Sequence, residues 1–424
     1  MKKIGIALMG LGTVGGGTYR ILTANKDYIR KVQGVDLEIM HILERDMTKV
    51  EALGVDPAIV STDVANIVNN KDIKIVAEFF GGIEPARSFL IAVLKAGKSV
   101  VTANKELVAK HWSDLEAAAK EGGAGLYFEA SCMGGVPVIR TLTEGMQGNH
   151  VQSIMGIFNG TTNYILTKMA DEGLEYADVL KEAQRLGYAE ANPSADVDGF
   201  DSMYKLSILS SLCFHKRVPI DKIYREGISK ISKQDIEFGK QFGFTLKLLA
   251  IGKLVDGKIE ARVHPAFVPD EHPLAGVKGS FNACFIVGDN VGDIMLYGRG
   301  AGDLPTGSAI VSDIVYCAKQ TEHRYCPFDN SAAGVRDEDF AANFESEYYV
   351  RMTVADKSGV LAKIAGVFAK YGVSINSLQQ TAEDGKASLL FMIHKTGENN
   401  LNQAIAEINS LNEVVAVDAV IRVM

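Results

Sequence analysis

The sequence has no long hydrophobic run, no excess of basic residues and few cysteines, and each absence excludes a class of protein. No apolar segment approaches the roughly 20 residues that a helix needs to cross a bilayer. The 44 lysines and arginines are outnumbered by 52 acidic residues, and a net charge of −8 argues against a general nucleic-acid binder. The five cysteines lie far apart and never form a CxxC pair, which excludes a disulfide framework and a cysteine zinc site. We therefore expect a cytoplasmic protein that binds neither nucleic acid nor membrane.

The first third of the chain alternates short apolar strands with helical segments. Its 424 residues exceed one ordinary domain, and 47% of them are hydrophobic, as in globular proteins. Predicted strands lie at 3–9, 35–43, 73–80, 99–102 and 126–129, and predicted helices at 84–96 and 114–121. This alternation is typical of a parallel sheet with helices on both faces. We predict an α/β fold with a parallel-sheet domain at residues 1–135.

In the remaining chain the predicted order of helices and strands changes twice. Residues 136–326 combine helices and strands without βαβ alternation, and we assign them to a second, α+β domain. An apolar helix at 309–320 could return to the first domain. A polar linker is predicted at 327–345. Residues 346–424 follow a βαββαβ pattern, which predicts a small sandwich.

The strand at 3–9 leads into the turn Gly10-Leu11-Gly12-Thr13-Val14-Gly15, and a helix should follow. In such a GxGxxG turn the first glycine permits a tight bend, the second lets the backbone approach a pyrophosphate, and the third lets the helix pack on the strand. The free amides of the helix N-terminus then face the phosphates. Because the motif stands between the first strand and its helix, it predicts a Rossmann-type dinucleotide site.

The end of the second strand should lie near the ribose of that dinucleotide, and it carries Glu44 and Arg45. An acid there would accept the 2′-hydroxyl of NAD, whereas an arginine would bind the 2′-phosphate of NADP. Arg45 favours NADP slightly. Two solvated charges without a ligand remain an open alternative.

Two lysines are candidates for chemistry. Lys105 closely follows the strand that ends at Thr102, at the sheet edge where ligands bind in open α/β folds, although it could equally be a surface lysine. Asp201 and Lys205 are four residues apart on the predicted helix at 200–214, so they share a face. If that pair is exposed, it contributes only a few tenths of a kcal/mol.

Acidic residues gather just before this pair. Glu190, Asp196, Asp198 and Asp201 fall in one short segment, where they could bind an ammonium group and tune a neighbouring lysine. A transition-metal site is less favoured because no histidine lies nearby. Cys132 could be a nucleophile, as an aldehyde-acylating dehydrogenase requires, or simply a small buried thiol.

Several longer motifs give the chain a resemblance to the homoserine dehydrogenase family over essentially its whole length. They are GLGTVG at 10–15, TANK at 102–105, EASCMGGVPVI at 129–139, NGTTNYIL at 159–166, GYAEANPSADVDGFDSMYKLSIL at 187–209 and YGRGAGDLPTGSAIVSDI at 297–314. The residues Asp356-Lys357-Ser358-Gly359-Val360-Leu361 in the last part resemble an ACT domain, a small-molecule-sensing module. The resemblance implies reversible NAD(P)H-dependent reduction of L-aspartate 4-semialdehyde to L-homoserine, on the route to threonine and methionine.

The resemblance also implies that residues 136–326 form a catalytic and dimerisation domain, and it implies roles for individual residues. By the family pattern Lys205 is the proton donor and acceptor, with Asp201 beside it. Glu190 would hold the substrate ammonium, and Lys105 would assist at the substrate and the nicotinamide. A lysine suits this reaction physically, because a proton donor must stand within hydrogen-bond reach of the oxygen that becomes negative.

Cofactor and cation positions follow from the same resemblance and from the turn. Those assigned to NADP or NAD are Gly10, Leu11, Gly12, Thr13, Val14, Gly15, Arg45, Thr102, Lys105, Gly187 and Gly302. Those that match the family's site for a monovalent cation such as Na+, made mostly of backbone carbonyls, are Glu129, Cys132, Gly134 and Val136. The family often has valine in place of Cys132, which weakens the nucleophile interpretation.

The C-terminal module and the assembly complete the expectations. We expect the ACT domain to sense an amino-acid effector, L-threonine, whose carboxylate could meet the free amides where Gly359 turns the strand into a helix. Its sheet edges favour pairing with another copy, so a homodimer or homotetramer is expected. Two alternatives remain: a different semialdehyde dehydrogenase that uses Cys132, and a catalytically silent amino-acid-sensing regulator.

Overall fold

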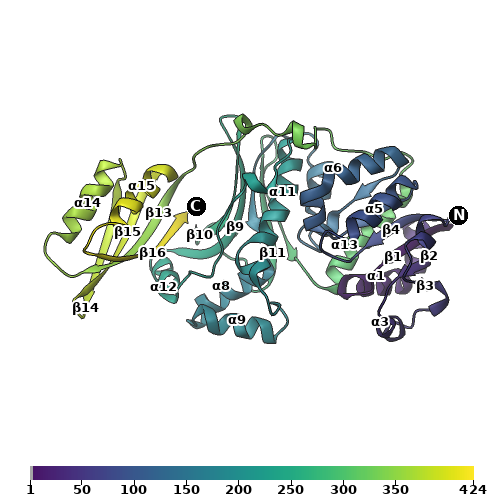
Figure 1. Cartoon of the computed structure of the whole chain (residues 1–424), viewed down its shortest axis with the longest axis horizontal. Helices are drawn as coiled ribbons and strands as arrows, with labels where there is room; N and C mark the ends of the chain where they lie inside the picture. Colours follow the sequence, from purple (N-terminus) through teal and green to yellow (C-terminus); the bar gives the residue numbers. More distant parts are fainter. Residues whose placement is uncertain (1–2) are drawn as a thin grey trace.

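The N-terminal strands form the parallel sheet that their alternation with helices predicts. The computed structural model describes residues 3–424, and its first sheet has the order β3-β2-β1-β4-β5-β6 (Figure 1). All of its neighbouring strands run parallel. The strands are β1 (Lys3–Met9), β2 (Asp36–Leu43), β3 (Val60–Ser61), β4 (Ile73–Glu78), β5 (Ser99–Thr102) and β6 (Leu126–Tyr127).

Helices cover both faces of this sheet, because successive side chains of β1 point to opposite sides. Ile6 and Leu8 pack with α1 and α13, whereas Ala7 and Met9 pack with α5 and α6. These helices are α1 (Thr13–Ala24), α5 (Ala86–Lys95), α6 (Lys105–Gly122) and α13 (Asp303–Lys319). Shorter ones are α2 (Lys26–Tyr28), the π-helical turn Ile29–Gln33, α3 (Met47–Ala52), α4 (Ala65–Val68) and the 3-10 turn Pro57–Ile59.

Two helices differ from their predicted bounds. The helix predicted at 114–121 begins much earlier, at Lys105, because the Asn104 side chain caps it by accepting a hydrogen bond from the backbone N–H of Leu107 at 3.1 Å. The helix predicted at 309–320 begins at Asp303 as α13 and packs against α1. A side chain at Gly17 would lie 2.2 Å from the carbonyl oxygen of Asp303, so the glycine permits this close approach.

The middle of the chain supplies a mixed sheet and its covering helices. Its strands are β7 (Val151–Ile157), β8 (Tyr224–Arg225), β9 (Phe244–Val255), β10 (Lys258–Pro269), β11 (Phe281–Gly288) and β12 (Gly292–Arg299). Its helices are α7 (Val138–Arg140), α8 (Gly160–Glu172), α9 (Tyr176–Arg185), α10 (Ser194–Val197), α11 (Phe200–Phe214) and α12 (Lys233–Gln241). Short turns are the 3-10 turns Glu129–Ser131 and Ile220–Lys222 and the π-helical Thr141–Gly145.

The last part has the βαββαβ order of an ACT domain. Its elements are β13 (Glu345–Ala355), α14 (Val360–Lys370), β14 (Ile375–Glu383), β15 (Lys386–Gly397), α15 (Glu398–Asn409) and β16 (Val414–Val423). Their sheet is continuous with the middle sheet, in the order β12-β11-β7-β9-β10-β16-β13-β15-β14, with β8 beside β10. The join is the parallel pairing of Ala266 with Arg422 and of Phe267 with Val423.

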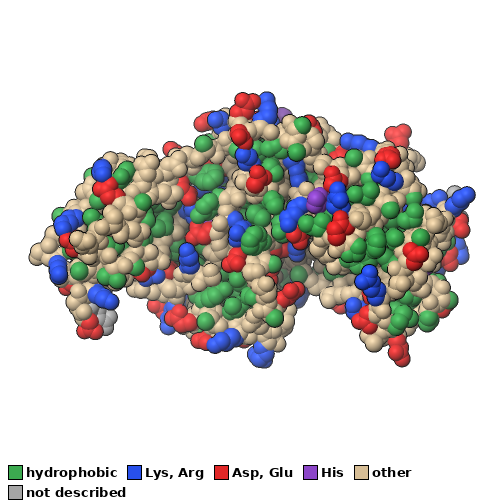
Figure 2. Space-filling view, viewed as in Figure 1, with side chains coloured by type: hydrophobic (Ala, Val, Ile, Leu, Met, Phe, Trp, Pro, Cys, Tyr) green, Lys and Arg blue, Asp and Glu red, His purple; other side chains and the backbone are tan. Residues whose placement is uncertain are grey.

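The segment predicted as a polar linker is largely exposed, and it contacts the folded parts at a few points. It contains the 3-10 turns Ala332–Gly334 and Asp337–Asp339, and Phe340 bridges to Ile259 at the edge of β10. This segment, α13 and the shared sheet all connect parts of the chain that the prediction assigns to different domains. The domain boundaries at residues 135, 326 and 345 therefore stay a prediction. Among residues 3–424, none of the helices has the length and apolarity to span a bilayer. On the face in Figure 2, acidic and basic side chains are intermingled.

Candidate active site

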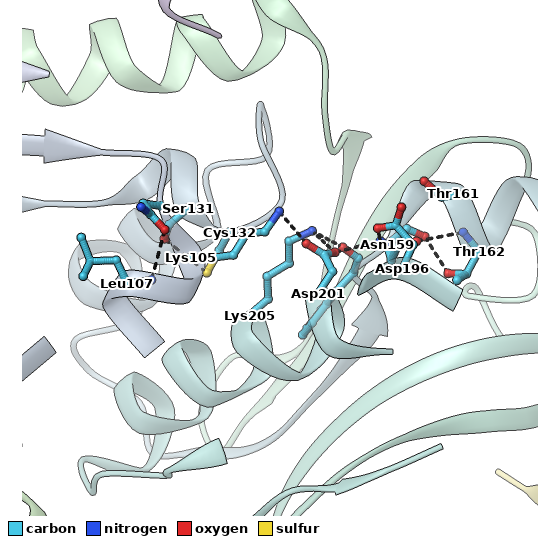
Figure 3. Close-up of polar contacts among 12 residues, drawn as sticks. Lys105, Leu107, Ser131, Cys132, Asn159, Thr161, Thr162, Asp196, Asp201 and Lys205 are labelled. Atoms are coloured by element: carbon cyan, nitrogen blue, oxygen red, sulfur yellow. Dashed lines mark hydrogen bonds and ion pairs between the residues drawn. The ribbon is translucent and has the colours of Figure 1, made fainter. Parts of the chain in front are cut away.

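The two predicted lysines meet at one buried carboxylate. Lys105 is the first residue of α6, directly after the carboxyl end of β5, and Asp201 and Lys205 lie on the first turns of α11. The Lys105 amine lies 2.8 Å from one oxygen of Asp201, and the Lys205 amine lies 2.6 Å from the other (Figure 3). The spacing argument alone left open an exposed ion pair, but Asp201 is 4% and Lys205 9% exposed.

The lysines set the charge of this carboxylate. Burial opposes ionisation of Asp201, but Lys105 and Lys205 outweigh burial and hold the pKa of Asp201 well below its usual range. Asp201 in turn raises the pKa of Lys105, with burial opposing. The Lys205 amine also donates a hydrogen bond to the carbonyl oxygen of Phe158 at 2.6 Å. Lys205 is therefore fixed at two points, while Lys105 is 43% exposed and has more freedom to reach a ligand.

The acidic cluster is only partly brought together. Asp196 shares a hydrogen-bond donor, Asn159, with Asp201, and burial followed by repulsion from Asp201 raises the pKa of Asp196. Asp198 contributes its backbone carbonyl to Arg225 instead. Glu190 lies on the exposed loop after α9, where its backbone carbonyl accepts from Gln184. Among residues 3–424 its carboxylate has no polar partner, so its role in holding an ammonium group stays a prediction.

The glycine turn has the shape that a dinucleotide requires. A side chain at Gly15 would lie 2.1 Å from the carbonyl oxygen of Gly10, which keeps α1 close to β1. A side chain at Gly12 would meet nothing within 4 Å, so the open side of the turn can receive a bulky ligand. Leu11, Gly12 and Thr13 line a cavity of about 250 Å³ there. Val14 follows Thr13 in the first turn of α1 and packs against the hydrophobic core that the first sheet forms with α1 and α13.

Glu44 and Arg45, the two charged residues predicted at the end of β2, lie in different environments. The Glu44 carboxylate accepts hydrogen bonds from the backbone N–H groups of Leu11 at 2.6 Å, of Arg45 at 2.8 Å and of Asp46 at 3.0 Å. Burial opposes ionisation, but these donors lower the pKa of Glu44. The Arg45 side chain is exposed beside them and has no partner among the described residues. Arg45 can therefore turn toward a ligand, whereas Glu44 is occupied by the turn.

The remaining cofactor positions lie in different settings. Thr102 is fully buried, and its hydroxyl donates to Glu78 at 2.5 Å while accepting from the backbone N–H of Asn104, so it shapes the strand end. Gly302 precedes α13 with a φ of 113°, close to the cavity beside the turn. Gly187 lies on an exposed turn after α9. Sequence reasoning missed Glu78, which has no neighbouring motif.

The Glu129 side chain is already satisfied by the protein. Its oxygens accept hydrogen bonds from the backbone N–H groups of Ile139 at 2.8 Å and Arg140 at 2.7 Å, and its own N–H donates to Asp313 at 2.9 Å. Burial and the nearby Asp313 raise the pKa of Glu129 to about 7. In the described part of the chain no three acidic, histidine or cysteine side chains gather as a metal site. A cation near Glu129 would therefore need backbone carbonyls.

The rest of the predicted cation segment supplies such carbonyls. The carbonyl oxygen of Val136 accepts from Val138, and each carbonyl oxygen has a second lone pair. Gly134 has a φ of 54° in the tight turn before Val136, whose backbone N–H donates to the carbonyl oxygen of Met133. Cys132 is fully buried, and burial raises the pKa of its thiol to about 12, so it is a poor nucleophile at neutral pH. This burial argues against the acyl-transfer alternative.

Comparisons with known families agree over the whole chain. Residues 10–129 match a family model described as the NAD-binding domain of homoserine dehydrogenase, residues 137–315 one described as homoserine dehydrogenase, and residues 348–413 one described as the ACT domain. A homoserine dehydrogenase of Corynebacterium glutamicum is 43% identical, over 99% of this chain and 96% of that protein. One of Bacillus subtilis is 38% identical, over 100% and 99%.

Solved structures give the same result. A homoserine dehydrogenase from Thiobacillus denitrificans superposes with a TM-score of 0.91 and 36% identity, covering 100% of this chain and 99% of that one. A hyperthermophilic archaeal homoserine dehydrogenase in complex with NADPH has a TM-score of 0.65 and 29% identity, covering 76% of this chain and 100% of that one.

Proposed function

Because this chain belongs to the homoserine dehydrogenase family, a family of nicotinamide-dependent oxidoreductases in amino-acid biosynthesis, we propose that Lys205 is its proton donor and acceptor. The observation that carries the proposal is the buried contact between the amine of Lys205 and Asp201. The reaction interconverts L-aspartate 4-semialdehyde and L-homoserine.

The proton transfer follows from the chemistry of the two partners. The reduced nicotinamide, when bound, supplies the hydride that converts the aldehyde carbon into an alkoxide-bearing carbon. The Lys205 ammonium then donates a proton to that oxygen, and in the reverse direction the neutral amine takes it back. Asp201 balances the ammonium charge before transfer and stays ionised throughout. Lys105, on the other side of Asp201, adds positive charge where the oxygen becomes negative.

The substrate ammonium is proposed to bind Glu190. Its carboxylate is exposed on the loop after α9 and is therefore available to a ligand. Glu190→Gln should raise KM for homoserine while leaving KM for the cofactor unchanged, since only the amino-acid end loses an ionic partner. Asp198→Asn, in the same acidic segment, is the matched control. An unaltered KM for homoserine would rule the assignment out.

For the cofactor, NADP is proposed as the preferred form. Arg45 is exposed beside the glycine turn, while the neighbouring Glu44 carboxylate is held by three backbone donors. Residues of the turn, together with Thr102, Lys105, Gly187 and Gly302, would form the rest of the site. The ratio of kcat/KM with NADPH to that with NADH should fall in Arg45→Ala but not in Arg30→Ala, whose cation pairs with Asp27 away from the cavity at the turn. An unchanged ratio would remove Arg45 from the site.

A monovalent cation such as Na+ is proposed near Glu129, Cys132, Gly134 and Val136. Support comes from the satisfied carboxylate of Glu129, which leaves backbone carbonyls as the available ligands. Hard cations of this kind prefer oxygen ligands. Activity measured in sodium, potassium and tetramethylammonium salts at equal ionic strength tests this. Equal rates in all three would argue against the site.

The ACT domain indicates regulation by an amino acid, and L-threonine is the proposed effector. Gly359, with a φ of 88°, places the start of α14 directly after β13, where free amides can meet a carboxylate. A homodimer or homotetramer in the cytoplasm is proposed. Threonine titration of the full chain and of Gly359→Val, with sedimentation of both, tests sensing and assembly. Undiminished threonine sensitivity in the variant would refute sensing at this turn.

The proton-transfer proposal is tested by Lys205→Met. The variant should lose most of kcat in both directions while it binds NADPH as tightly as the unaltered enzyme. Equal loss of kcat and of cofactor binding would show that Lys205 is structural.

A further inference from the structure

Asn159 lies at the junction of β7 and α8 with its orientation fixed by the backbone. Its side-chain oxygen caps α8 by accepting a hydrogen bond from the N–H of Thr162 at 2.8 Å. This contact assigns the oxygen to the helix end, so the side-chain nitrogen must point the other way. Asn159 is 5% exposed, and among residues 3–424 both its hydrogens are used within the protein.

The side-chain nitrogen of Asn159 bridges two carboxylates. It donates to Asp196 at 2.7 Å and to Asp201 at 2.9 Å (Figure 3). The oxygen of Asp201 that it contacts is the same one that accepts from Lys205. A neutral donor thus stands between two acids that repel each other, and together with Lys205 it fixes one oxygen of Asp201, while Lys105 contacts the other.

The residue before Asn159 holds the other member of the pair. The Phe158 carbonyl oxygen accepts from the amine of Lys205 at 2.6 Å. Of the two consecutive residues that follow β7, Phe158 therefore contacts Lys205 and Asn159 contacts Asp201. A shift of this segment would move the acid and the amine together, whereas loss of the Asn159 side chain would release Asp201 alone.

We propose that Asn159 is a positioning residue for proton transfer, whose carboxamide holds Asp201 in the orientation in which that carboxylate serves both lysines. This inference rests on the proposed role of Lys205 and extends it to a residue on a different element. Asn159 does not touch the reacting atoms; it acts through Asp201.

Neither of two similar side chains can replace the carboxamide. Serine preserves the helix cap but is too short to reach the acids. Aspartate also preserves the cap, but its carboxylate cannot donate a hydrogen bond. It would place a third negative charge beside Asp196 on α10 and Asp201 on α11. The other charged or titratable groups around this point are Lys205 on α11, Lys105 on α6 and the buried Cys132 thiol.

The test compares Asn159→Ser and Asn159→Asp with a matched buried asparagine. In both variants kcat for homoserine oxidation should fall about 10²-fold, because a misplaced reacting group costs rate and not cofactor affinity. KM for NADP should stay within about twofold, since the glycine turn is untouched. The solvent deuterium isotope effect on kcat should rise, because the proton step becomes slower.

Asn163→Ser is the control. Asn163 lies one turn later on α8 and is also buried, but its side chain contacts Lys247 and the carbonyl oxygens of Val277 and Phe281. It should lose stability without losing kcat. If Asn159→Ser fails to fold, Asn159→Asp still decides the question. Loss of kcat in the Asn159 variants equal to that in Asn163→Ser would overturn the inference.

Lys205→Met, measured beside them, separates the two proposals. If Lys205→Met keeps kcat, the proposed function itself fails. If Lys205→Met is inactive while both Asn159 variants retain full kcat and an unchanged isotope effect, only the inference about Asn159 fails.

Discussion

Two buried ionic clusters lie on opposite sides of the middle part, and they use different cations. At the candidate active site Asp201 is held by Lys105 and Lys205. Where β16 joins β10, Arg422 binds Glu398 through two nitrogens, one of them at 3.0 Å, and contacts Glu226 at 2.9 Å. Burial opposes the charge of Arg422, but Glu398 outweighs burial and raises its pKa above the usual range.

The difference follows from what each cation can do. An arginine keeps its proton at every accessible pH, and its planar fork fixes the geometry of a carboxylate. A lysine binds through one movable point and can give up a proton. The molecule thus has lysine where a proton is proposed to move and arginine where two parts must stay joined. Substitutions of the two kinds of cation should therefore have different effects: those at the lysine should lower kcat, and those at the arginine should lower the free energy of unfolding.

The largest effect is expected at the active site. Lys205→Arg keeps a positive charge but removes the transferable proton, so kcat should fall by about 10²- to 10⁴-fold in both directions. Steady-state kinetics of homoserine oxidation, with NADPH binding measured by fluorescence, checks both halves of the prediction. Retention of kcat by the arginine variant would mean that charge alone matters there.

The second effect concerns stability. Arg422→Met leaves the buried Glu398 and the half-buried Glu226 without their cation, and the loss at Glu398 should lower the free energy of unfolding by about 3–5 kcal/mol. Urea unfolding of the full chain measures this, while kcat per folded molecule should not change. Lys395→Met is the matched control, because its pair with Glu345 is exposed and contributes at most about 1 kcal/mol. Similar losses in both variants would contradict the contrast.

The smallest effect sharpens the comparison with a buried lysine that forms no ion pair with the residues that the structure describes. Lys247 is 2% exposed, and its amine donates to the Asn163 side chain at 3.1 Å and to the carbonyl oxygen of Val277. Burial lowers the pKa of Lys247 to about 8. The unfolded chain, with a lysine pKa of about 10.4, then binds more protons between these values, so the free energy of unfolding should rise with pH from about 8 to about 10.

In Lys247→Met this rise should disappear. Urea unfolding at a series of pH values, compared between the two proteins, isolates the contribution of one amine. Parallel curves over that range would show that Lys247 is not the group responsible.

The sequence predicted those parts of the site that are close in the chain. The glycine turn, its strand and its helix are one continuous segment, so spacing was enough to identify them. Asp201 and Lys205 lie one helical turn apart, and the helix at 200–214 was predicted with its observed bounds. Local periodicity carries this kind of information.

The contacts that bury the pair come from elsewhere. Phe158 and Asn159 are more than forty residues away from Lys205 and Asp201, and β7, the strand before them, was not predicted. Burial of an ion pair depends on such packing, which no short window of sequence contains. For the same reason the pairing of β16 with β10 could not be predicted, because parallel pairing joins segments that lie far apart in the chain.

The pairing of β10 with β16 has a consequence for biosynthesis. β10 pairs with β9 along its length and with the short β8, and its pairing with β16, at Ala266 and Phe267, can form only when residues 414–423 have left the ribosome. Until then a nascent chain would display an open strand edge, the kind of surface on which unfinished polypeptides associate wrongly. Translation of the C-terminal module would thus cover part of the edge of β10 in the middle sheet as well as add the ACT domain.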